Sequence, residues 1–172
     1  MTRLFGISLC SAALIAVTAI GAGHAAAPVR TVNSGTNSFL LPAGAGCAFD
    51  VLVSAVGTTT RTVFSDGRTV RVANAQITLT NGADPEQTYL WTTNAHDTET
   101  ILDDGSIQAV TNGRILYWFF PGDQGPFGVV GENGALFGFV GDVSATFDAN
   151  TFQITSFSWA GTATELCAEL AS

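Results

Sequence analysis

The stretch Gln76-Ile77-Thr78-Leu79-Thr80-Asn81-Gly82 decides the fold class of this chain. Its first five residues alternate polar and apolar side chains, which is the period of a β-strand with one buried face. Asn-Gly follows at once, and both residues tolerate the positive φ angles of a tight hairpin turn. This combination predicts an antiparallel hairpin at this point of the chain.

The same combination recurs along the chain, which predicts an all-β protein. Further turn signals are Asp66-Gly67, Asp103-Asp104-Gly105, Asn112-Gly113, Asn133-Gly134 and Asp148-Ala149-Asn150. Between them lie runs rich in Thr, Val, Ile and aromatic residues, typical of strands. We predict strands at about 48–56, 60–66, 68–74, 76–81, 87–93, 97–102, 106–111, 114–120, 135–140, 143–148 and 151–160. Only residues 163–171 could form a short helical turn.

The short connections between these strands predict an antiparallel meander. A Greek key needs long crossings, and nearly all of the predicted connections are short enough for hairpins. We therefore expect a closed β-barrel of about 8–10 strands. A β-sandwich is the alternative, because many short strands with regular turns also fit that architecture.

The first residues predict export. Arg3 is followed by an apolar run over residues 4–20 and then by small residues around Ala25, the pattern of a cleavable signal peptide. We expect a signal peptide at 1–25, a polar and flexible N-terminal segment at 26–46, and a single all-β domain at 47–170. The expected location is secreted or extracellular, with no membrane span after cleavage.

Two cysteines remain after the expected cleavage, Cys47 and Cys167. An even number of cysteines in an exported chain indicates a disulfide, and with two residues the pairing is unambiguous. Cys47 precedes the first predicted strand and Cys167 follows the last. A disulfide between them brings the two ends of the sheet together, which closure into a barrel would provide.

The charge excludes some classes of partner. The chain has 14 acidic residues, six Arg and no Lys, so no basic patch can neutralise the phosphates of a nucleic acid. His96 is the sole histidine of the predicted mature chain, and strand alternation places Asp97 and Glu99 on the face opposite to it. We expect no metal, no cofactor and no assigned catalytic residue.

The most suggestive stretch for function is Arg114-Ile115-Leu116-Tyr117-Trp118-Phe119-Phe120-Pro121, in which both strand faces are apolar. Something must cover the face that an ordinary barrel strand turns to water. Aromatic side chains with a few polar groups are typical of a small-molecule site, although aromatic residues also dominate ordinary cores. We predict that the wall of a ligand site comprises Trp91, Tyr117, Trp118 and Phe120, with Arg114 as its polar group.

Three functions follow as hypotheses. The first is a non-enzymatic β-barrel that binds a small apolar or aromatic ligand. The second is a structural or interaction protein of the cell envelope or extracellular space, whose aromatic residues cover a partner or a homodimer face. The third is an isomerase or cyclase that uses the lumen, which requires titratable side chains that point inward together.

The mature chain resembles small exported proteins of actinobacteria whose function is not characterised. The stretches that carry this resemblance are 39–44, which lead into Cys47, then 147–152, and finally 156–161 with the end at Cys167. None of these stretches is chemically specific, and the resemblance implies no activity and no site residue. At the level of architecture, the predicted barrel looks like the barrels of lipocalins, avidins and allene oxide cyclases, without their motifs.

Overall fold

The computed structural model describes residues 27–172, which form one antiparallel meander with the strand order β1-β2-β3-β4-β5-β8-β9. The strands are β1 Val29–Leu41, β2 Val51–Val63, β3 Thr69–Asn81, β4 Thr88–Ile101, β5 Ile107–Phe119, β8 Ala135–Phe147 and β9 Ile154–Glu165. A two-stranded hairpin, β6 Gln124–Gly125 and β7 Gly128–Val129, follows β5, and α1 Leu166–Leu170 ends the chain. The predicted all-β antiparallel meander is confirmed.

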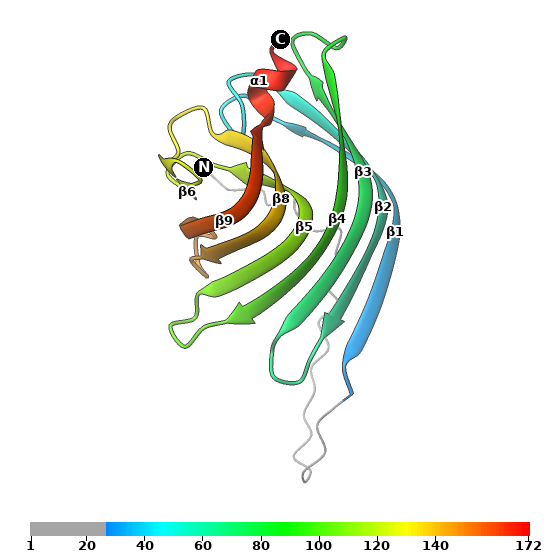
Figure 1. The fold of residues 1–172 in the computed structure, drawn as a ribbon, viewed down its shortest axis with the longest axis vertical. Helices are drawn as coiled ribbons and strands as arrows, with labels where there is room; N and C mark the ends of the chain where they lie inside the picture. Colours follow the sequence, from blue (N-terminus) through cyan, green and yellow to red (C-terminus); the bar gives the residue numbers. More distant parts are fainter. Residues whose placement is uncertain (1–26) are drawn as a thin grey trace.

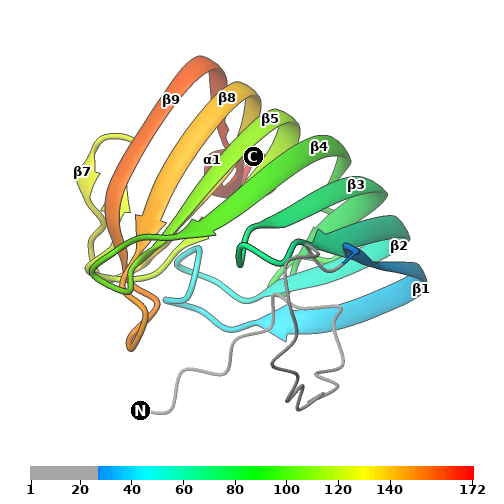
Figure 2. The same cartoon turned by 90° about the horizontal axis from the view of Figure 1, so that it is seen from below.

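The sheet is strongly curved, and α1 lies on its concave side (Figures 1 and 2). Within residues 27–172, β1 pairs only with β2 and β9 only with β8, so these two strands are the edges of the sheet. The predicted closure into a barrel is not found. The structure is an open trough of seven long strands rather than a ring of shorter ones.

Residues 29–41 belong to the sheet, whereas the sequence predicts a flexible segment over 26–46. β1 pairs with β2 along its full length, from Val29↔Val63 to Leu41↔Val51. Hydroxyl groups add cross-strand hydrogen bonds on the outer face, such as Ser38 Oγ to Ser54 Oγ at 2.9 Å. β1 contributes little buried apolar area and is held chiefly by backbone pairing. The predicted signal peptide at 1–25 lies outside the described residues.

Most of the predicted strands are halves of longer ones. The predicted breaks near residues 57, 75, 95, 113 and 141 all lie inside observed strands of 13 or 14 residues. Asn112-Gly113, predicted as a turn, is part of β5. Gly113 pairs with Gly141, and Gly141 pairs with Gly161, so the glycines that suggested breaks form one row across the sheet.

This glycine row, Gly113, Gly141 and Gly161, bends the strands without ending them. The three residues have φ values of +116°, +131° and +124°, a conformation that residues with a side chain rarely adopt. A Cβ on Gly141 would lie 2.1 Å from the carbonyl oxygen of Ala160 on the neighbouring strand. The row thus combines an unusual backbone conformation with close strand contact, the device that curves a sheet.

Two hydrophobic clusters stabilise the trough. The first joins α1 to residues of six strands: Leu41, Cys47, Val51, Val53, Leu79, Trp91, Leu116, Leu136, Leu166 and Leu170. The second lies on β5, β8 and the start of β9: Tyr117, Phe119, Phe137, Phe139, Val143, Ala145 and Ile154. β5 therefore serves both clusters, with Leu116 in the first and Tyr117 and Phe119 in the second. This explains why the sequence of β5 is apolar on both faces.

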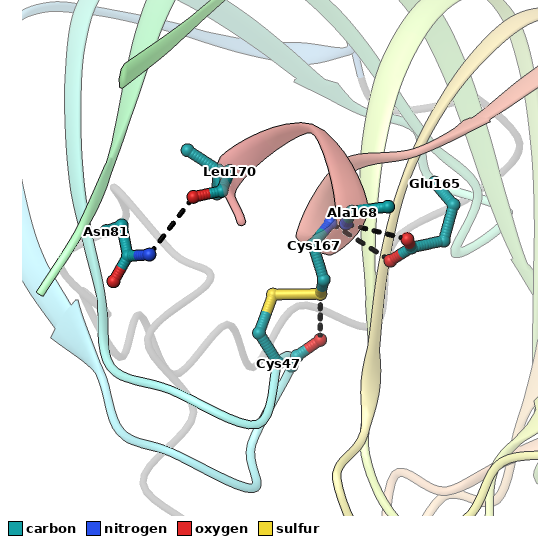
Figure 3. The surroundings of a disulfide bond; sticks show 7 residues. Cys47, Asn81, Glu165, Cys167, Ala168 and Leu170 are labelled. Atoms are coloured by element: carbon teal, nitrogen blue, oxygen red, sulfur yellow. Dashed lines mark hydrogen bonds between the residues drawn. A yellow bond between two sulfur atoms is a disulfide. The ribbon is translucent and has the colours of Figure 1, made fainter. Parts of the chain in front are cut away.

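The predicted disulfide between Cys47 and Cys167 is confirmed, with a Cα–Cα distance of 5.5 Å (Figure 3). It joins the loop after β1 to α1, at one end of the trough, rather than two adjacent edge strands. Glu165 caps α1 by accepting hydrogen bonds from the backbone N–H groups of Cys167 and Ala168. At the other end of α1, the Asn81 side chain donates to the carbonyl oxygen of Leu170 at 3.0 Å.

Candidate functional site

A cavity of about 440 Å³ lies within the part of the chain that the structure describes. This volume falls within the range of pockets that hold small organic molecules. The lining residues come from β3, β4, β5, the end of β8, the start of β9 and the segments after β5 and β8: Arg71, Asp97, Glu99, Ile107, Ala109, Thr111, Ile115, Leu116, Tyr117, Trp118, Phe120, Asp123, Phe147, Phe152 and Ile154. Most of these side chains are apolar or aromatic. Three of the four charged ones lie on β3 and β4, and the fourth, Asp123, lies after β5.

The apolar wall is held in place by the second hydrophobic cluster. Tyr117 packs edge-on against Phe157, with ring centroids 5.4 Å apart. Asp123 is almost fully buried and fixes the segment after β5, because its carboxylate accepts hydrogen bonds from the backbone N–H of Phe120 at 2.7 Å and of Ile154 at 3.1 Å. These contacts fix the positions of the side chains and of the backbone segment that form the apolar wall.

The polar end of the cavity is a row of paired residues on three adjacent strands. Arg71 lies opposite Asp97, and Asp97 lies opposite Thr111. The guanidinium Nη1 of Arg71 is 3.6 Å from Asp97 Oδ2 and 2.6 Å from Glu99 Oε1. The hydroxyl of Thr111 donates to Asp97 Oδ1 at 3.0 Å and is 3.5 Å from the Tyr117 hydroxyl. One guanidinium nitrogen thus serves two carboxylates.

Burial governs the titration of this polar end. Burial raises the pKa of Asp97, against the opposing effects of the Thr111 hydrogen bond and the Arg71 charge. Burial also raises the pKa of Glu99, again opposed first by Arg71. Burial raises the pKa of Tyr117 to about 12, so this phenol is neutral at physiological pH.

The structure separates the five residues that the sequence singles out. Tyr117, Trp118 and Phe120 line the cavity. Trp91 does not; it is 2% exposed and belongs to the first hydrophobic cluster. Arg114 lies over the Trp91 ring, 4.5 Å from its centroid, and donates to the carbonyl oxygen of Thr92 at 3.1 Å. The polar group predicted for the site therefore lies with Trp91, away from the cavity.

The charged residues at the polar end of the cavity, Arg71, Asp97 and Glu99, are absent from the predicted site. Alternation gives a signal for two of them, because Asp97 and Glu99 share a strand face with Trp91 and Ala95, both of which are buried. The expected placement of His96 on the opposite face is confirmed, since it is exposed. Alternation alone does not give the register between β3 and β4, and this register places Arg71 opposite Asp97.

Comparison with known proteins finds no matching family model, no matching curated protein and no matching solved structure. Between residues 27 and 172, no helix has the length and apolar character needed to cross a membrane. In the same part of the chain, no group of three or more His, Cys, Asp or Glu side chains is placed to hold a metal ion. Function is therefore inferred from the cavity itself.

Proposed function

We propose that this protein is an exported, non-enzymatic binder of a small ligand with an apolar or aromatic body. The single observation that carries the proposal is the cavity of about 440 Å³, with its aromatic wall and one polar end. Such a division of surfaces suits a molecule that buries an apolar body and orients one polar group. The wall residues Tyr117, Trp118 and Phe120 supply large rigid surfaces for this purpose.

Export is part of the same proposal. The pattern of residues 1–25 favours a cleaved signal peptide. The Cys47–Cys167 disulfide supports it, because disulfides persist in oxidising compartments and are rare in the cytosol. The acidic composition is compatible with solubility outside the cell.

Filling the cavity should weaken the binding of a neutral apolar probe. Ala109 is a small buried residue of the cavity lining, so Ala109→Phe places a ring in the space for the ligand. We expect at least about tenfold weaker binding of N-phenyl-1-naphthylamine, the loss of roughly 1.4 kcal/mol. The measurement is a fluorescence titration of the purified mature protein.

Val110→Phe is the matched control for this variant. Val110 precedes Thr111 on the same strand but is 48% exposed on the outer face, so the added ring leaves the cavity unchanged. We expect probe affinity equal to that of the unmodified protein. If Ala109→Phe folds and still binds the probe normally, or if the unmodified protein binds no apolar probe, the proposed function is wrong.

A second candidate is an interaction role, and a specific surface favours it. Phe127 and Val129, at the β6–β7 hairpin, are 79% and 67% exposed. The Phe127 ring lies 5.6 Å from that of Trp159 on the edge strand β9. Under this candidate, sedimentation would show a complex, such as a homodimer, that Phe127→Ser dissociates. A protein that is monomeric at all concentrations would contradict the homodimer.

The lumen isomerase or cyclase receives less support from the same cavity. Its requirement for inward titratable groups is met by Asp97 and Glu99. Both carboxylates are in contact with Arg71, and Asp97 also accepts the Thr111 hydrogen bond. These contacts hold the carboxylates in a fixed array, which suits recognition of a polar group better than proton transfer.

A further inference from the structure

The charges of the cavity lining are unbalanced. The lining contains three carboxylates, Asp97, Glu99 and Asp123, and one cation, Arg71. The lining therefore carries two negative charges in excess when all three carboxylates are ionised. Asp123 accepts hydrogen bonds from two backbone N–H groups, whereas Asp97 and Glu99 contact Arg71 and form the polar end.

Arg71 compensates these two carboxylates only in part. Both contacts use the same nitrogen, Nη1, and the Arg71 side chain is itself 37% exposed. Arg61, opposite Arg71 on β2, adds positive charge at longer range and donates to Thr69, but it does not line the cavity. Thr111 and Tyr117 bring hydroxyl groups and no charge. Two partly buried carboxylates with one counter-ion attract a second cation.

The aromatic wall suits the same kind of group. Five aromatic side chains line the cavity: Tyr117, Trp118, Phe120, Phe147 and Phe152. Aromatic faces attract organic cations, and the attraction strengthens where water is excluded. The net negative charge of the whole protein also attracts cations towards it. An anionic ligand, in contrast, would be repelled by the two carboxylates that contact Arg71.

We propose that the cavity selects an organic cation, with the apolar body against the aromatic wall and an ammonium group at Asp97 and Glu99. This inference rests on the proposed function and specifies its ligand class. It assigns Glu99 and Asp97 as the residues that determine specificity for charge. The aromatic wall then determines affinity for the body of the ligand.

Three probes that share one ring system test the inference by calorimetry on the unmodified protein. They are 1-naphthylmethylammonium, 1-naphthalenemethanol and 1-naphthoate, which differ in the charge of the polar group. We expect the ammonium to bind at least about tenfold more tightly than the alcohol, and the carboxylate most weakly. Equal affinity for the ammonium and the alcohol, or tighter binding of the carboxylate, would overturn the inference while leaving the proposed function intact.

Glu99→Gln should remove most of the preference for the ammonium and leave the affinity for the alcohol unchanged. Glu86→Gln is the matched control, because it alters net charge equally at an exposed loop residue outside the cavity. Thermal unfolding verifies that both variants are folded. Retention of the full preference in a folded Glu99→Gln protein would overturn the assignment. If the unmodified protein binds none of the three ligands, that is, neither the ammonium nor the alcohol nor the neutral apolar probe, the proposed function is overturned as well.

The affinity for the ammonium should rise with pH. Burial raises the pKa of Asp97 and of Glu99, so both retain protons in mildly acidic solution and bind a cation weakly there. As the pH rises through these raised pKa values, both lose their protons and binding strengthens. The other charged or titratable groups near these two carboxyl groups are Arg61, Arg71, His96 and Tyr117. The affinity for the alcohol should stay constant, and an ammonium affinity that falls with rising pH would contradict the inference.

Discussion

Removal of the Cys47–Cys167 disulfide lowers the free energy of unfolding by about 4–5 kcal/mol, the largest loss we expect from any change to this protein. The two cysteines are 120 residues apart in the sequence, and a crosslink over such a loop greatly restricts the unfolded chain. The variant is Cys47→Ala combined with Cys167→Ala. Urea unfolding followed by tryptophan fluorescence gives the difference in free energy.

The reducing agent provides the control for this result. Treatment of the unmodified protein with a phosphine reductant should lower its stability towards that of the double variant, and the same treatment should not affect the variant. A loss below about 1 kcal/mol would contradict the expectation and show that the unfolded chain is already compact.

The disulfide also stabilises one particular part of the folded protein, the helix α1. This role predicts where stability is lost first. Leu166 and Leu170 of α1 are fully buried in the first hydrophobic cluster. α1 has only five residues and cannot form a stable helix alone. The Cys167 crosslink and the Asn81 hydrogen bond hold it over that cluster (Figure 3). Hydrogen exchange in α1 and at the end of β3 should therefore accelerate first on reduction.

The sequence is sufficient to predict the fold class and the disulfide because both depend on local or countable features. Gln76–Thr80 alternates in the sequence, and these residues lie in β3. Two cysteines remain after cleavage of the predicted signal peptide, and they leave one possible pairing. The openness of the sheet was not predictable in the same way, because closure depends on whether the two outer strands meet. No local pattern in β1 or β9 encodes that relation.

Strand lengths were underestimated for a physical reason. Asn112-Gly113 and Gly141-Asp142 have the composition of turns, yet both pairs lie inside long strands at the bend of the sheet. Glycine can adopt a positive φ both in a turn and at a bend inside a strand, and the sequence does not distinguish these two cases. β1 was missed for the opposite reason: Val29–Leu41 is polar, and an edge strand needs little burial when its backbone is paired.

The candidate site could be predicted only in part. The apolar character of Tyr117, Trp118 and Phe120 indicated a wall, and these residues line the cavity. Arg71 and Asp97 are 26 positions apart in the sequence, and their contact depends on the β3–β4 register. Trp91 looked like a wall residue because aromatic residues suit cores and ligand sites equally. Long-range register therefore limits what a single sequence reveals about this site.

The bend of the sheet should be highly sensitive to substitution at Gly141. Gly141 has a φ of +131°, and a Cβ there would lie 2.1 Å from the Ala160 carbonyl oxygen, far closer than real Cβ contacts. Because Gly141 and Gly161 are paired, and a Cβ on Gly161 would lie 2.1 Å from the Val140 carbonyl oxygen, neither strand can retreat easily. We expect Gly141→Ala to cost roughly 3–5 kcal/mol, from backbone strain together with overpacking.

Gly105→Ala separates the two parts of this cost. Gly105 has a φ of +85° at an exposed turn, but nothing lies within 4 Å of a Cβ there. Its substitution should cost only the conformational penalty, roughly 1–2 kcal/mol. The measurement is urea unfolding of both variants beside the unmodified protein. If the two alanine variants lose equal stability, close strand contact at the bend contributes nothing, and the curvature of the trough does not depend on the glycine row.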